Sequence, residues 1–235
     1  LCNRGKSVNL YQNTPNTVLF LGDHIYQYHL KEKKFSTITE EEGKDIVGTL
    51  VPFDHQENLT YINDIKHIYE LDDQTSRLKT VFECYTDTVI SSVSHDEQGH
   101  FWIGSNFGLI HYDPVLKSRT LVPTNLFTEI NMVLCDQKGK VWIGVDNMLF
   151  AYFIKEQKFV LFGESNGAIQ NEYLPNARLV NEQGDAYIGG VKGMLRIDGQ
   201  LLLNTSEMPE LQLLDITING ESANHEWYNH PAKIS

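Results

Sequence analysis

A unit of about 40–45 residues recurs along this chain, and this repeat constrains the fold more than any other feature. The clearest copies share an Asp/Asn-x-x-Gly turn, an aromatic residue and Ile-Gly. Equivalent apolar residues stand at positions 25, 68, 109, 149 and 194, at intervals of 43, 41, 40 and 45 residues. Four short strands per unit at this period are typical of β-propeller blades. The sequence therefore predicts an all-β fold, a β-propeller of about five four-stranded blades.

The five copies lie near residues 8–38, 46–82, 89–122, 130–162 and 177–199. We assign residues 1–205 to the propeller and 206–235 to the start of a truncated second β domain, because 209–220 alternates apolar and polar residues and ends in Asn-Gly. The five copies either close a ring, with a strand near 8–11 helping to seal it, or form part of a larger propeller. An unclosed array leaves sheet edges bare, so a homodimer formed through those edges is a further hypothesis.

The repeated positions have a structural interpretation. The Asp-x-x-Gly turns beginning at Asp96, Asp136 and Asn181 predict tight hairpins between the first and second strands. Because an aromatic residue occupies the same position in three successive copies, we expect these rings to pack between adjacent blades: Trp102, Trp142 and Tyr187. A glycine ends each second strand, where we expect the chain to bend: Gly104, Gly144 and Gly189.

Composition excludes several classes of protein. The 31 acidic residues outnumber the 19 basic ones, for a net charge of −12, which argues against a nucleic-acid partner. No apolar run approaches the roughly 20 residues that span a bilayer, so we expect any membrane attachment through other parts of the parent protein. The three cysteines lack CxxC spacing, which argues against a disulfide scaffold or zinc ribbon. The chain begins with leucine, and we expect both ends to be cuts through a larger protein.

We predict no catalytic residue, metal site or cofactor. The segment 163–167 matches the G-x-S-x-G nucleophile elbow, but it lies in a predicted inter-blade loop without the helix that an elbow requires. His225 and His230 stand five residues apart near the end of the chain, a spacing that does not place both imidazoles on one helical face.

Ligand contacts are expected from irregular loops at one mouth of the propeller. The loop over 163–176 is the longest inter-blade connection. In it, Asn171 and Glu172 can hydrogen-bond to sugar hydroxyl groups, and the ring of Tyr173 can stack on a pyranose. These three residues are the predicted ligand-binding residues.

The repeats also suggest a family. The segment Asp96–Asp113 reads Asp-x-x-Gly-x-x-Trp-Ile-Gly-x-x-x-Gly-Leu-x-x-Tyr-Asp and resembles the two-component regulator propeller repeat. The fifth copy resembles the last repeat of such arrays, and Ile216–Gly220 resembles the start of the Ig-like triple-tyrosine domain that follows them. The match covers about 90–220. Copies one and two lack the turn and the tryptophan, and copy four has Asp146, Asn147 and Met148 where Gly-Leu is usual.

The combination resembles the periplasmic sensor region of hybrid two-component histidine kinases from polysaccharide-using bacteria. The resemblance implies propellers that are usually seven-bladed, bind oligosaccharides and signal through the Ig-like domain and a membrane helix to a cytoplasmic kinase. This chain would then be a non-enzymatic sensor region with an oligosaccharide as its partner. Two alternatives remain: a propeller enzyme, a lyase or hydrolase acting on polysaccharide, and a protein-interaction scaffold.

Overall fold

The structure, a computed structural model, describes residues 9–22, 24–38, 50–56, 59–85, 87–201, 217–218 and 221–222. The chain divides into two compact units, residues 1–201 and residues 202–235. The described part of the second unit consists of two short antiparallel strands, β20 (Thr217–Ile218) and β21 (Glu221–Ser222). Most of the strand predicted over 209–220, the Ig-like domain that it would begin, and both His225 and His230 lie outside the described residues.

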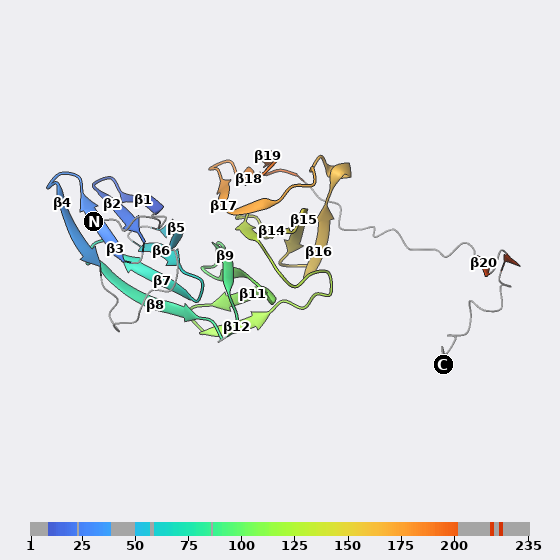
Figure 1. Cartoon of the computed structure of the whole chain (residues 1–235), viewed down its shortest axis with the longest axis horizontal. Coiled ribbons are helices and arrows are strands. Elements are labelled where there is room, and N and C mark those ends of the chain that lie inside the picture. The colour runs from blue at the N-terminus through green and yellow to red at the C-terminus, as the bar shows by residue number, and fades with distance from the viewer. Residues whose placement is uncertain are drawn as a thin grey trace. The chain divides into compact units, whose positions relative to one another are not determined.

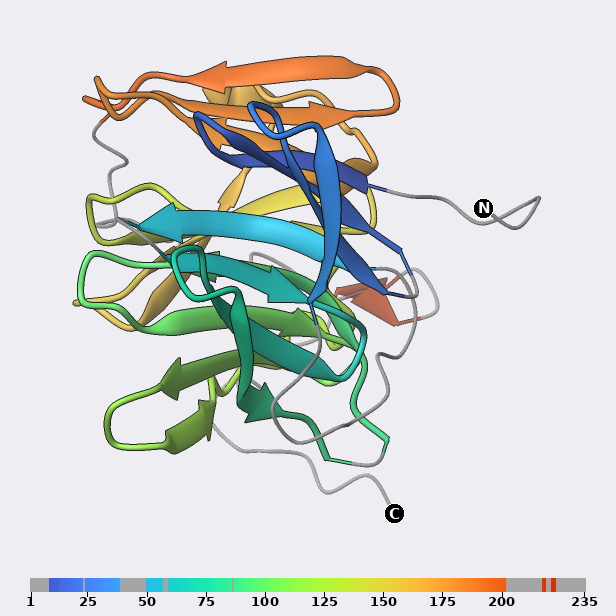
Figure 2. The same cartoon turned by 90° about the vertical axis from the view of Figure 1, so that its left-hand side faces the viewer.

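The first unit consists of five antiparallel sheets arranged as the blades of a β-propeller (Figure 1, Figure 2). Within each blade every strand pairs with the next one in sequence. Blade 1 contains β1 (Asn9–Thr14), β2 (Thr17–Leu21), β3 (Ile25–His29) and β4 (Lys34–Ile38). Blade 2 contains β5 (Val51–Gln56), β6 (Leu59–Asn63), β7 (His67–Asp72) and β8 (Arg77–Glu83). Blade 3 contains β9 (Ile90–His95), β10 (Phe101–Ser105), β11 (Gly108–Asp113) and β12 (Ser118–Leu121).

Blades 4 and 5 complete the array. Blade 4 contains β13 (Met132–Cys135), β14 (Lys140–Val145), β15 (Met148–Phe153) and β16 (Lys158–Phe162). Blade 5 has three described strands, β17 (Tyr173–Val180), β18 (Ala186–Gly190) and β19 (Gly193–Ile197). The predicted all-β propeller with five blades is confirmed. In the described part of the chain, no helix has the length and apolar character needed to cross a bilayer.

The first strand of blade 5 begins earlier than predicted. We expected it to begin at residue 177, whereas β17 begins at Tyr173. The register shifts between the pair Tyr173–Gly190 and the pair Arg178–Ile188. Pro175 lies within this shift and has no N–H to donate to a sheet ladder, so the pairing is interrupted there. Because of this irregularity, the start of the strand cannot be predicted from the alternation of apolar and polar residues.

The hairpins between the first and second strands of blades 3, 4 and 5 explain the recurrent turn residues. Asp96 Oδ1 accepts hydrogen bonds from two backbone N–H groups of its turn, at 3.0 and 2.9 Å. The side chains of Asp136 and Asn181 accept equivalent bonds in their own turns. Gly99 closes the first turn at a φ of 85°, which glycine adopts without steric cost. The predicted tight hairpins are therefore confirmed.

Apolar side chains from facing blades form the cores between them. Between blades 3 and 4, the rings of Trp102 and Tyr152 lie 5.6 Å apart, in a buried cluster that also contains Leu109, Val133 and Ile143. Similar clusters fill the spaces between blades 1 and 2 and between blades 2 and 3. The fold is thus held together by pairwise contacts between neighbouring blades, as in other repeat proteins.

The recurrent glycine of the second strand has a different role from the expected bend. Gly104 lies inside β10, where a Cβ atom would be 2.7 Å from Ile130 Cγ2 and 2.9 Å from Val133 Cγ2. A Cβ atom at Gly144 would be 3.0 Å from Tyr173 Cβ, on blade 5. The missing side chain therefore lets the next blade approach closely.

The two terminal blades each leave an apolar face exposed. We call these the leading face of blade 1, with Leu10, Tyr26 and Phe35, and the trailing face of blade 5, with Leu179 and Met194. Met194 is 69% exposed, whereas Leu109 and Leu149, at the equivalent positions of blades 3 and 4, are buried. Among the described residues, these two faces lack the neighbouring blade that covers the same positions elsewhere.

Candidate functional site

A cavity of about 600 Å³ lies where the first hairpins of blades 3, 4 and 5 come together. Its walls come from the first strands and first turns of four blades, which include the following residues: Phe53, His95, Glu97, Gln137, Arg178 and Glu182. The volume falls within the range of small-molecule sites. We therefore take this cavity as the candidate functional site.

Arg178 is a charged residue in the wall of the cavity. Its side chain extends from β17 of blade 5, and Nη2 donates a hydrogen bond to the carbonyl oxygen of Val93 in β9 of blade 3. Burial lowers the pKa of the Arg178 guanidinium to about 10, so the group is still a cation at neutral pH. Nη1 is buried and has no hydrogen-bond partner among the described residues. A buried donor without an acceptor costs free energy, which a bound acceptor would recover.

The thiol next to Arg178 does not neutralise this charge. Cys135 is fully buried, and burial raises the pKa of its thiol well above the usual range. The thiol is therefore protonated at neutral pH and offers no anion to the guanidinium. The carboxylate of Asp136, in the same wall, lies 2.9 Å from Lys140 Nζ.

Aromatic side chains also contribute to the wall of this cavity, which includes Phe53 and His95. The imidazole of His95 stacks on the ring of Tyr61, with centroids 5.6 Å apart and planes 20° from parallel. Phe53 lies beside Tyr61, at a centroid distance of 6.1 Å. Glu97 and Glu182 add carboxylates, so the cavity presents a cation, acceptor oxygens and aromatic surface together.

The three predicted ligand residues lie at the other end of blade 5, near the turn between β18 and β19. Asn171 is buried: its Oδ1 accepts from the backbone N–H of Lys192 at 2.8 Å, and its Nδ2 donates to the carbonyl of Gly193 at 3.2 Å. Tyr173 is buried against blade 4, and its hydroxyl donates to a backbone carbonyl. Of the three side chains, that of Glu172 is exposed. Asn171 and Tyr173 thus have structural partners, and sugar contact at this loop stays a prediction.

The remaining predicted positions lie within the blades. Trp102 and Trp142 are buried, whereas Tyr187, on the exposed side of blade 5, is partly accessible. A Cβ atom at Gly189 would lie 2.9 Å from Ala177 Cβ. The G-x-S-x-G segment forms one turn of 3₁₀ helix, Glu164–Asn166, without the strand-to-helix geometry of a nucleophile elbow.

Sequence reasoning missed Arg178, although the repeat contains a signal for it. When the copies are aligned on their turns, position 178 corresponds to Val93 and Val133, which are buried apolar residues. An arginine where the other copies have valine departs from the packing pattern. Such a departure indicates either that the copies are misaligned or that a charged side chain with a functional role lies in the interior.

Comparison with family models gives no match for this sequence, and comparison with curated proteins gives none either. Solved structures do match it. One is the extracellular domain of a B. thetaiotaomicron protein described as a hybrid two-component system, with a TM-score of 0.61 and 14% identity over 82% of this chain and 27% of that one. Another B. thetaiotaomicron extracellular domain, from a protein described as a one-component system, has a TM-score of 0.61 and 16% identity over 83% of this chain and 27% of that one.

A chain from a nidogen–laminin complex also matches, with a TM-score of 0.57 and 11% identity over 82% of this chain and 75% of that one. By contrast, the protein described here spans only about a quarter of the length of the two bacterial domains. Proteins of quite different descriptions share the architecture, so at these identities the likeness concerns the fold. The comparisons therefore support the β-propeller fold of this chain.

Proposed function

We propose that this propeller is the periplasmic sensor region of a hybrid two-component histidine kinase and binds an oligosaccharide in the cavity around Arg178. The observation that carries the proposal is the buried guanidinium of Arg178, a residue of the cavity wall, whose Nη1 has no partner among the described residues. The descriptions of two structurally similar bacterial domains and the resemblance of the repeats support the signalling role. The proposal assigns no catalytic residue to the chain.

The chemistry of the cavity suits a sugar. Hydroxyl and ring oxygens of a saccharide can accept a hydrogen bond from Arg178 Nη1, and its hydroxyl groups can donate to Glu97 and Glu182. The rings of Phe53 and His95, which line the cavity and both contact Tyr61, offer surface for a pyranose face. A site that supplies donors, acceptors and apolar surface together matches the mixed surface of a carbohydrate.

The position of Arg178 links binding to the arrangement of the blades. Its other terminal nitrogen, Nη2, already joins blade 5 to Val93 in blade 3. A ligand shifts a conformational equilibrium only by its differential affinity for the states. A sugar held by Nη1 would favour the arrangement in which this guanidinium spans the two blades, and a connected kinase would sense that preference.

We expect Arg178→Met to weaken oligosaccharide binding by about 10-fold or more, because a hydrogen bond to a charged group contributes about 1.5–3 kcal/mol. The measurement is isothermal titration calorimetry against a panel of neutral and acidic oligosaccharides. Lys31→Met is the matched control, because it removes a positive charge from an exposed turn of blade 1. The control should bind like the wild-type chain.

Circular dichroism of Arg178→Met establishes whether the variant folds, and Arg178→Lys provides a second test because it keeps the charge but not the planar guanidinium. Equal affinities of the wild-type chain and both Arg178 variants would contradict the proposed site. A panel in which no sugar binds the wild-type chain would contradict the proposed function.

A protein-interaction role is a second candidate, and the exposed apolar faces favour it. The leading face of blade 1 and the trailing face of blade 5 carry side chains that interior blades bury against each other. Because the apolar clusters between neighbouring blades join the trailing face of one blade to the leading face of the next, we expect the two exposed faces to be complementary. Association of chains through these faces would bury both.

We expect the chain to self-associate as its concentration rises, with a mass in multi-angle light scattering above that of the monomer. Met194→Glu should reduce this association because it places a charge on the trailing face of blade 5, where the methionine is 69% exposed. Val115→Glu is the control, since that side chain is exposed on a turn of blade 3, away from both faces. A monomeric mass at high concentration would argue against association.

A further inference from the structure

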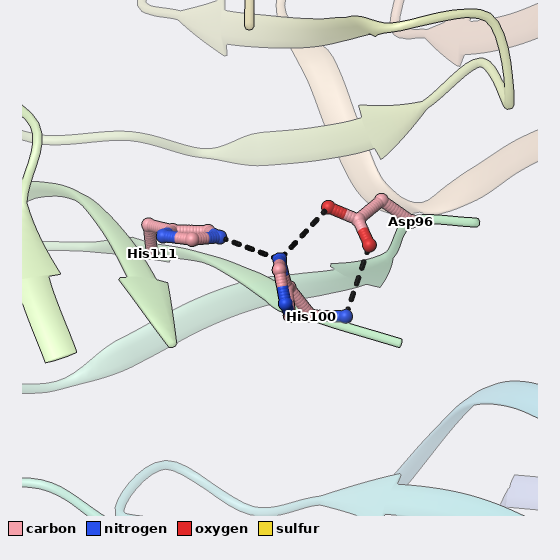
Figure 3. A group of neighbouring side chains, drawn as sticks. All are labelled: Asp96, His100 and His111. Carbon is pink, nitrogen blue, oxygen red and sulfur yellow. Dashed lines mark hydrogen bonds and ion pairs between the residues drawn. The ribbon is translucent and has the colours of Figure 1, made fainter. Parts of the chain in front are cut away.

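Blade 3 brings a carboxylate and two imidazoles together beside its first hairpin (Figure 3). Asp96 begins the turn after β9, His100 ends that turn, and His111 lies in β11. His111 Nε2 is 3.1 Å from His100 Nδ1, and the same Nδ1 is 3.8 Å from Asp96 Oδ2. One ligand atom from each side chain lies within 4.8 Å of the other two.

We propose that Asp96, His100 and His111 form a binding site for Zn²⁺. Two imidazole nitrogens and one carboxylate oxygen are ligands that zinc prefers. With bonds of about 2.0–2.2 Å, the ligand atoms of a tetrahedral zinc ion lie about 3.3–3.6 Å apart. Two of the three separations, 3.1 and 3.8 Å, bracket this range, and the third is no more than 4.8 Å, so side-chain rotations that bring His111 and the Asp96 carboxylate closer together would place all three on a common ion.

In blades 4 and 5, a positively charged side chain lies beside a carboxylate of the first hairpin. In blade 4, Lys140 stands at the position of His100, and its Nζ lies 2.9 Å from Asp136 Oδ2. In blade 5, Arg196 stands at the position of His111, and its Nη2 lies 2.7 Å from Asp185 Oδ2. In both blades, a permanently charged side chain thus forms an ion pair with a carboxylate of the first hairpin.

Blade 3 has no lysine or arginine at either equivalent position. It places two imidazoles there, next to Asp96, and imidazole has no permanent charge. A bound zinc ion would supply the positive charge that Lys140 and Arg196 supply in the following blades. The comparison within one molecule therefore supports a positive charge near the first hairpin of blade 3, as in blades 4 and 5.

Neighbouring groups orient the ligands. His100 Nε2 lies 3.6 Å from Asp113 Oδ2, and Asp113 is itself fixed because Oδ1 accepts two backbone N–H bonds of the following turn. A proton on Nε2 facing this carboxylate leaves the lone pair on Nδ1, the nitrogen that faces His111 and Asp96. Carboxylates that orient metal-binding histidines in this way are a regular feature of zinc sites. The Trp102 indole donates to Asp96 Oδ2 at 2.8 Å and holds that side chain in place.

A cavity adjoins the cluster on the side of Asp96. It has a volume of about 320 Å³, and its walls include Asp96, Gln98 and Lys140. An ion in this cavity would therefore have access to the carboxylate of the cluster.

The test measures Zn²⁺ bound by the whole 235-residue chain, without a histidine tag, after equilibrium dialysis. The key variant combines His100→Lys with His111→Ala, because blade 4 already folds with Lys140 and Ala151 at these positions. We expect it to bind one zinc ion fewer per chain than wild type. The control His24→Gln, at an exposed imidazole in blade 1, should bind as many ions as wild type.

Two further measurements distinguish a specific zinc site from incidental binding. Asp113→Asn should weaken zinc affinity by about 10–100-fold, the usual effect of removing an orienting carboxylate. Zinc should raise the melting temperature of the wild-type chain and leave that of the double variant unchanged, because an ion that binds the folded state stabilises it. Equal zinc stoichiometry and affinity in the wild-type chain and the double variant would overturn the proposal, as would a wild-type chain that binds no zinc.

Discussion

Replacing Trp142 with alanine should lower the free energy of unfolding by about 3–5 kcal/mol, the usual cost of removing a large ring from a packed core. Trp142 is 1% exposed and packs edge-on against Phe162, with ring centroids 5.2 Å apart. Its side of blade 4 faces blade 5, where Tyr173 approaches Gly144. The alanine variant would leave a cavity at this interface, and a urea titration followed by circular dichroism would measure the loss.

Two variants serve as controls for this prediction. Trp142→Phe keeps most of the ring volume and removes an indole N–H that has no hydrogen-bond partner among the described residues, so its cost should stay below about 1.5 kcal/mol. Tyr187→Ala changes the equivalent but partly exposed ring of blade 5 and should cost less than Trp142→Ala. An unchanged unfolding midpoint for Trp142→Ala would show that the ring does not support the interface.

Replacing Asp96 with alanine should lower the free energy of unfolding by about 2–4 kcal/mol. Asp96 accepts two backbone bonds through Oδ1 and the bond from Trp102 Nε1 through Oδ2. Alanine would leave the buried indole N–H without an acceptor and would open the turn, and each buried unsatisfied group costs about 1–3 kcal/mol. Chemical denaturation should be measured with a chelator present, so that bound metal does not contribute.

Asp96→Asn is the informative control for that prediction. It keeps one acceptor oxygen, and Asn181 holds the equivalent turn of blade 5 through its own side-chain oxygen, at 2.8 Å from the backbone nitrogen of Asp185. Asparagine should therefore cost less than half of what alanine costs. If both variants lost the same stability, the negative charge of Asp96 and not its hydrogen bonds would hold the hairpin.

The blades could be predicted from the sequence because the information for each one is local. A blade is a meander in which each strand pairs with the next, so the turn at Asp96 and the alternation after it place three strands without any distant contact. The ring at Trp102 recurs at position 142, and this recurrence by itself indicates a packing role. The predicted start of the first strand of blade 5 was wrong, because Pro175 interrupts the backbone pairing of β17.

The candidate site could not be predicted in the same way, because it depends on which residues of separate blades meet. Arg178 is surrounded by residues of blades 3 and 4. The sequence near Arg178 does not reveal these neighbours, nor that Nη1 has no partner among the described residues. Asn171 and Tyr173 have side chains suited to sugars, yet the fold buries both. His100 and His111 are eleven positions apart in the sequence, and only the pairing of β10 with β11 brings their rings together.

The bond from Arg178 to Val93 has a consequence for the order of folding. It joins residues 85 positions apart, whereas the strands of each blade are neighbours in sequence. Contacts between distant residues form late because a long stretch of chain must first be ordered between them. We therefore expect blade 4 to dock on blade 3 before the guanidinium of blade 5 reaches its acceptor. The cavity would then be completed late in folding, so we expect a ligand that fills it to bind the fully assembled blades and not an earlier intermediate.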